Sequence, residues 1–141
     1  MKLVIDMLAL AIFGLAPLVA AAQKPADHDQ VGIELNKLEQ VDAACRIYMV
    51  VRNGSTAYEG FKLDVVLFDK SGVIASRVAV GMGPLRAERP TVKLFDVQHQ
   101  PCEGIGSLLV NEVLECRPAD AASDCLARIE VSSRTDVQIL R

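Results

Sequence analysis

The sequence of 141 residues contains no tryptophan and few other aromatic residues, which limits what its core can be made of. Its four phenylalanines and two tyrosines are too few to supply the bulk of a hydrophobic core. The apolar content is nevertheless high, at 51%. A folded domain of this chain must therefore be built mainly from valine, leucine, isoleucine and alanine.

An excess of positive charge is also missing. The chain has 15 Lys and Arg residues against 18 Asp and Glu, a formal net charge of -3, and its basic residues occur singly along the sequence. Proteins that bind nucleic acid usually carry clustered basic residues. We therefore expect no nucleic-acid partner.

Motifs that would indicate catalysis or a bound cofactor are absent from the sequence. It contains no glycine-rich phosphate loop between a strand and a helix, no H-E-x-x-H pair and no C-x-x-C pair. The acidic residues alternate with apolar ones, as on the solvated face of a strand. We expect a protein that is not an enzyme and that needs no cofactor.

One stretch resembles a catalytic motif and has to be weighed separately. Residues 63–72, LDVVLFDKSG, resemble the start of the phosphorylatable-aspartate motif of haloacid dehalogenases and cation-pumping ATPases. That motif requires a threonine after the glycine, where this chain has Val73, and it belongs to a helix-rich α/β domain. A second β-branched run begins at once after Gly72, so we predict that Asp69 opens a hairpin turn and that Gly72 adopts a positive φ.

The first residues have the parts of a secretory signal. Lys2 is followed by an apolar run from Leu8 to Ala20 and by small residues up to Ala22. We predict a signal peptide over 1–22, a polar leader over 23–30 and one domain over 31–141. A retained membrane anchor is the alternative, but the uncharged run 7–23 is short against the ~20 apolar residues that span a bilayer. The expected location is periplasmic or secreted, with no membrane anchor after cleavage.

Four cysteines, Cys45, Cys102, Cys116 and Cys125, follow the predicted cleavage site. An even number in an exported chain is typical of disulfides, because the compartment is oxidising. A metal site of four cysteines is the alternative, although structural zinc sites usually carry closely spaced pairs and the nearest pair here is nine residues apart. Two disulfides are the favoured interpretation.

Alternating apolar and polar residues predict a series of short strands. Such patterns occur at 31–36, 45–51, 61–68, 73–80, 91–97 and, around a break at 133–136, in the closing segment. Residues 105–116 fit both helical and strand spacing, and the neighbouring strands favour a strand. About seven strands with frequent turns predict an all-β, antiparallel two-sheet sandwich.

Part of the chain resembles a known family. The block 45–97 is similar in layout to the fibronectin-type and FxLYD-like immunoglobulin-fold modules of bacterial envelope proteins. The shared features are a strand closing at Asn53-Gly54, the strand and turn VVLFDKSG, and a loop leading to a strand of alternating Val and Leu. The whole chain also resembles small exported proteins of proteobacteria. The resemblance implies an immunoglobulin-like sandwich and no particular activity.

The same resemblance implies a disulfide pairing. In immunoglobulin topology the strand that starts at Cys45 would be B and the strand 91–97 would be E, its antiparallel neighbour. The start of B then lies near Cys102, just beyond the end of E. Cys116 would end F and Cys125 would precede G. The implied pairing is Cys45–Cys102 with Cys116–Cys125, one of three possible pairings.

The function expected from these features is a non-catalytic binding or accessory module. Such a module would contact another envelope protein through a sheet face or an unpaired edge strand. Four apolar residues at outward positions, Tyr48, Val50, Val66 and Phe68, are the candidate binding residues. They are core residues instead if a second sheet covers them.

The alternative function is a small metal-binding protein. His99 and Cys102, with Met82 or Met49, offer the soft ligands that suit copper or zinc. This hypothesis requires free thiols, so it competes directly with the disulfide interpretation.

Overall fold

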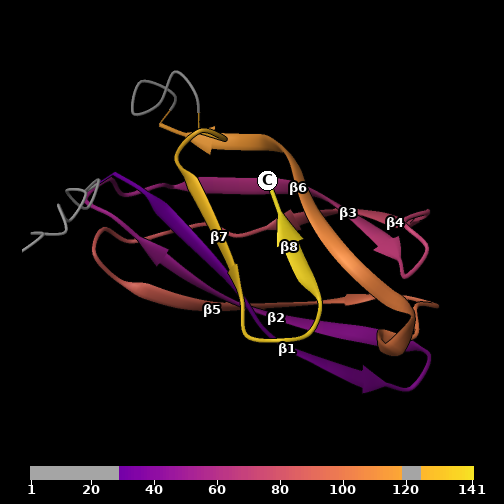
Figure 1. Cartoon of the computed structure of the whole chain (residues 1–141). Helices are drawn as coiled ribbons and strands as arrows, with labels where there is room; N and C mark the ends of the chain where they lie inside the picture. The colour runs from indigo at the N-terminus through magenta and orange to yellow at the C-terminus, as the bar shows by residue number, and fades with distance from the viewer. Residues whose placement is uncertain (1–28, 119–124) are drawn as a thin grey trace, which may run out of the picture.

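The structure is a computed structural model that describes residues 29–118 and 125–141 (Figure 1). The predicted signal peptide, its cleavage after Ala22 and most of the predicted leader lie outside these described residues. Within the described ranges, no helix has the length and apolar character needed to cross a bilayer.

Two four-stranded sheets make up the fold, which confirms the predicted all-β sandwich. The ambiguous segment 105–116 is a strand, and a short 3-10 turn, η1, precedes it. The first sheet has the order β5-β2-β1-β7, with β1 at Val31–Val41, β2 at Ala44–Asn53, β5 at Pro90–Val97 and β7 at Ile129–Ser133. The second sheet has the order β4-β3-β6-β8, with β3 at Gly60–Asp69, β4 at Ile74–Gly81, η1 at Cys102–Gly104, β6 at Ile105–Arg117 and β8 at Gln138–Leu140.

The core lies between the sheets and follows the period-two pattern of the sequence. On β2, Ile47, Met49 and Val51 are fully buried, whereas the residues between them turn outward. The buried aromatic residues Tyr58 and Phe61 make an edge-to-face contact with ring centroids 5.1 Å apart. As the composition requires, aliphatic side chains form most of the remaining core.

The segment DKSG is a hairpin turn between β3 and β4, as predicted. Asp69 Oδ1 accepts hydrogen bonds from the Ser71 backbone N–H (2.8 Å), the Ser71 hydroxyl (2.6 Å) and the Val73 backbone N–H (2.9 Å). These hydrogen bonds, chiefly the one from the Ser71 hydroxyl, hold the pKa of Asp69 below its usual value. Gly72 has φ 83°, a conformation that favours glycine. Asp69 therefore caps a turn.

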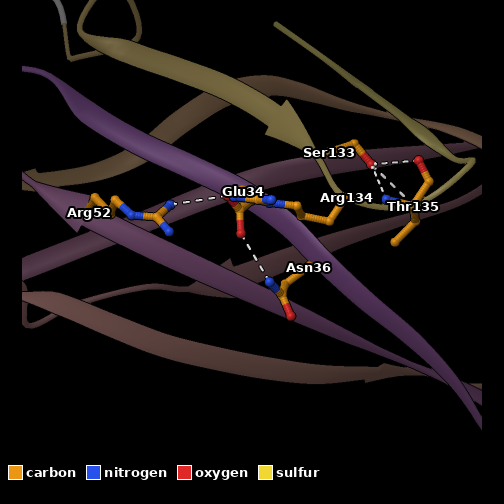
Figure 2. Close-up of polar contacts among 6 residues, drawn as sticks. All are labelled: Glu34, Asn36, Arg52, Ser133, Arg134 and Thr135. Carbon is orange, nitrogen blue, oxygen red and sulfur yellow. Dashed lines mark hydrogen bonds and ion pairs between the residues drawn. The ribbon is translucent and has the colours of Figure 1, made fainter.

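The end of the chain departs from a purely antiparallel sandwich. The closing segment forms two strands in different sheets: β7 runs parallel to β1, and β8 runs parallel to β6. Between them the Ser133 hydroxyl accepts a hydrogen bond from the Thr135 backbone N–H (Figure 2). The Ser133 hydroxyl also donates to the Val137 carbonyl, and the Thr135 hydroxyl accepts from the Val137 backbone N–H. The predicted break is thus a crossover between sheets, which is why the structure has eight strands instead of about seven.

The sandwich is joined along one side and open along the other. On the joined side the chain passes directly from β7 to β8 (Figure 1). On the other side β4 and β5 are the edge strands of their sheets, and each lacks a partner strand on its outer edge among the described residues. We call β4, β5 and the loop 82–89 that connects them the open side.

Candidate functional site

The four candidate binding residues lie on two different surfaces. Tyr48 and Val50 are on the outer face of the first sheet, because they alternate with the core residues of β2. Val66 and Phe68 are on the outer face of the second sheet and lie outside the core cluster. The structure therefore does not bring the four residues together into one surface.

On the first sheet, the candidate residues sit beside a more exposed pair on β5. Tyr48 is opposite Leu94 and Val50 is opposite Val92, so the four side chains share one face. Tyr48 is partly engaged within the protein, since its hydroxyl donates to Glu39 at 2.5 Å. Val92 and Leu94 are 63% and 54% exposed, and neither is among the binding residues predicted from the sequence.

On the second sheet, the candidate residues are again less exposed than their neighbours. Val66 is only 7% exposed and has Arg77 as its cross-strand neighbour. Phe68 is half-buried and lies opposite Ile74, the first residue of β4. Ile74 is 63% exposed, and Val73 in the preceding turn is 61% exposed.

Most of the exposed apolar side chains lie on or beside the edge strands β4 and β5. Among the described residues, six large hydrophobic side chains are exposed, and four of them lie on β5, at the start of β4 or in the turn before it. The two others are Leu114 on β6 and Leu140 on β8. Val92 and Leu94 lie on the outer face of the first sheet, and Ile74 lies opposite Phe68 on the outer face of the second. These side chains flank the two edges of the open side, which is the candidate functional site because exposed apolar groups often mark interaction sites.

The two edge strands differ in how well they are protected against pairing. β5 begins with Pro90, and its Lys93 lies opposite Met49 and so points toward the inner face. Proline and inward-pointing charges are devices that discourage strand pairing at an edge. On β4 the inner-face residues are Ser76, Val78 and Val80, and the strand contains no proline or lysine. The edge of β4 is therefore the one open to an added strand.

A buried carboxylate holds the first sheet to the crossover. Glu34 on β1 accepts hydrogen bonds from Asn36 (3.0 Å), Arg52 (3.3 Å) and Arg134 (3.2 Å), as Figure 2 shows. The hydrogen bond from Asn36, followed by that from Arg134, lowers the pKa of Glu34 although burial opposes the shift. The network fixes the turn after β7 against the centre of the sheet.

A second buried carboxylate plays the same role on the opposite face. Asp64 on β3 accepts two hydrogen bonds from Arg77 on β4, both 2.8 Å, and one from Asn111 on β6 at 2.7 Å. These donors, Arg77 first, keep the pKa of Asp64 below its usual value. Arg77 thereby anchors the edge strand β4 to the middle of its sheet.

We expect the protein to lose stability as the pH falls below about 5. Because the pKa values of Glu34 and Asp64 are lowered by folding, their stabilisation is complete above the unfolded values of about 4.3 and 3.9 and is lost as the pH falls through the folded values. The double variant Glu34→Gln/Asp64→Asn should be less stable at pH 7 and should change less between pH 7 and pH 3. Urea unfolding at a series of pH values measures both effects.

The exposed residue Glu130 on β7 provides the control for this experiment. Glu130→Gln should leave stability nearly unchanged, since surface substitutions away from such networks have small effects. If the double variant loses as much stability on acidification as the wild type, the two buried carboxylates are not the cause.

Both disulfides have the predicted pairing, Cys45–Cys102 and Cys116–Cys125. No cysteine in the described residues is free, and none of their His, Cys, Asp and Glu side chains form a group of three suited to a metal. His99 is exposed after β5, whereas Met49 and Met82 are buried in the core. The copper or zinc hypothesis requires a free thiol at Cys102, but Cys102 is bonded to Cys45 in a disulfide.

A hollow of about 440 Å³ lies beside Cys102 at one end of the sandwich. The hairpin turn after β3, η1 and the turn after β7 contribute to it. Its charged residues are of both signs, so its charge does not select one class of ligand. The lining consists of Lys70, Cys102, Glu103, Ile105, Gly106, Asp136 and Val137.

Comparison with known protein families and with curated proteins finds no match for this chain. Among solved structures, IrmA from Escherichia coli is similar, with a TM-score of 0.51 and 14% sequence identity. The match covers 72% of this chain and 90% of IrmA. At this identity the similarity shows the fold alone.

Proposed function

We propose that this protein is a non-catalytic binding or accessory module of the periplasm that contacts another envelope protein through its open side. The observation that carries the proposal is that exposed apolar side chains flank both edges of the open side. They are Val92 and Leu94 on β5, Ile74 at the start of β4 and Val73 in the turn before it. Apolar side chains beside unpaired backbone groups are the features that strand-adding partners use.

The cysteines and the first residues support the proposed compartment. The two disulfides are typical of an exported protein, because they persist in oxidising environments. The predicted signal peptide over 1–22 supports export through the inner membrane. Together they favour a partner in the same compartment, which in a Gram-negative cell is another envelope protein.

The first test replaces two exposed apolar residues of the open side. The variant Ile74→Ser/Leu94→Ser should reduce the amount of crosslinked partner about tenfold, since each interface anchor commonly contributes more than ~1 kcal/mol. The measurement is affinity purification from chemically crosslinked envelopes, with the partner quantified by mass spectrometry. Both side chains are exposed, so the substitutions should leave the fold intact.

The matched control is Leu114→Ser/Leu140→Ser. These leucines are 49% and 45% exposed and belong to β6 and β8, away from the edges of β4 and β5. The control should recover the partner as the wild type does. Equal loss in both double variants, or no reproducible partner with the wild type, would count against the proposed function.

A further inference from the structure

The segment that forms most of the open side carries more basic than acidic residues. Residues 70–95 contain five basic residues and one acidic residue, Glu88, whereas the rest of the sequence has ten basic and seventeen acidic residues. The segment comprises the hairpin turn, β4, the connecting loop and most of β5. A chain with a net charge of -3 thus has an edge of positive charge. The five basic residues are Lys70, Arg77, Arg86, Arg89 and Lys93.

Most of these charges are not neutralised within the protein. Of the five, only Arg77 forms an ion pair among the described residues, with Asp64. Lys62, which lies opposite Gly81 at the end of β4, adds one more unpaired positive charge. Elsewhere, described basic residues are largely paired with carboxylates, as Arg46 is with Asp96. The positive charge at the open side is therefore available to a partner.

The edge of β4 has the shape that an added strand requires. Its side chains Ala75 and Ala79 are small and exposed, and nothing lies within 4 Å of where a side chain at Gly81 would begin, so no bulky group on β4 blocks another strand. Ile74 offers one apolar contact at the start of the strand. β5 lies on the same side but is protected by its inward Lys93.

We propose that an extended segment of the partner, carrying acidic side chains, adds to the second sheet as a further strand along β4. This inference rests on the proposed function and names the chemistry of the partner. Backbone hydrogen bonds to β4 supply the affinity, and the unpaired basic residues select acidic over basic sequences. A peptide strand is favoured over a polyanion because charge alone makes no use of the unpaired backbone of β4.

The test uses the exported protein, purified with its disulfides intact, and a capped eight-residue peptide of alternating valine and glutamate. On addition of the peptide, amide hydrogen exchange should slow in Ile74–Gly81 and remain unchanged in Pro90–Val97. Binding should weaken when the salt concentration is raised from about 0.05 M to about 0.5 M, because the contacts are exposed to solvent. The same peptide with lysine in place of glutamate should bind at least tenfold more weakly.

Two matched variants test the charges. Arg86→Gln/Lys93→Gln should weaken peptide binding about tenfold. Arg128→Gln/Arg141→Gln removes the same charge from the joined side and should bind as the wild type does. Equal weakening in both variants would overturn the assignment of the charge to the open side.

Further measurements distinguish strand addition to β4 from binding by charge alone and from pairing with β5. A peptide with the same charges but with proline in place of valine cannot form a ladder. If it binds equally well, or if slowed exchange appears on β5 or nowhere, strand addition to β4 is overturned. If the crosslinked partner depends on Ile74 and Leu94 but not on Arg86 and Lys93, the proposed function stands and this inference fails.

Discussion

Replacing Phe61 by alanine is expected to lower the free energy of unfolding by about 3–5 kcal/mol. The ring is 2% exposed and packs edge-to-face against Tyr58, so its removal leaves a cavity and also breaks an aromatic pair. The backbone carbonyl of Phe61 accepts hydrogen bonds from Met82 (2.7 Å) and Gly83 (2.9 Å), which places the backbone of Phe61 beside the start of the loop from β4 to β5. A typical domain has about 5–15 kcal/mol of stability in total, so the variant should be close to unfolding.

Phe68 provides the control on the same strand. It is half-buried on the outer face of β3, so Phe68→Ala should cost about 1 kcal/mol. Urea unfolding of the two variants, monitored by circular dichroism, gives the two free energies. A larger loss for Phe68→Ala than for Phe61→Ala would mean that Phe68 faces the core, and the inner and outer faces of the second sheet would have to be exchanged.

The difference between these two phenylalanines shows what the sequence can predict. The alternation along β3 correctly separates Phe61 and Leu63 from Asp64 and Phe68, because side chains on a strand alternate between faces. The turn at Asp69 was equally predictable, since the hydrogen bonds of an aspartate to the next residues are local. Fold class and turn chemistry depend on neighbours in sequence, and both are confirmed.

Which strands pair with each other is harder to predict from the sequence than which residues face the core. Alternation marks Tyr48 and Phe68 both as outward, but it does not say that they lie on opposite sheets. The immunoglobulin resemblance supplied the pairing of β2 with β5, and with it the Cys45–Cys102 disulfide. It did not supply the parallel strands at the end of the chain, because the crossover at 134–137 is decided by contacts far away in sequence. The hydrogen bond from the Arg134 backbone to Leu35 is one of these contacts.

The distribution of unpaired charge over the surface is a further property that cannot be predicted from the sequence. Lysines and arginines occur singly along the chain, so the sequence indicates no positive surface. The structure neutralises many of them through distant carboxylates, as Glu34 does for Arg52 and Arg134. Of the described basic residues without an ion pair, Arg86, Arg89 and Lys93 lie on the open side. Which charges remain unpaired depends on the tertiary fold, so it could not be predicted from composition.

Removing the Cys45–Cys102 disulfide is expected to cost roughly 4 kcal/mol, against roughly 3 kcal/mol for Cys116–Cys125. The first closes a loop with a sequence separation of 57 residues and the second one of 9, and a longer loop restricts the unfolded chain more. The variants are Cys45→Ala/Cys102→Ala and Cys116→Ala/Cys125→Ala, each serving as the control for the other. Urea unfolding under non-reducing conditions measures both free energies.

The native contacts around the Cys45–Cys102 disulfide should add to the loss of stability that its long loop predicts. Cys45 is fully buried at the start of β2, and the Cys102 backbone N–H donates to the Gln40 side chain at 2.9 Å, which ties η1 to the first sheet. Losing this bridge should therefore also release η1 and expose the end of the core. If the short bridge contributes more than the long one, restriction of the unfolded chain is not the main source of stability. The contacts around Cys116 and Cys125 at the end of β6 would then have to supply it.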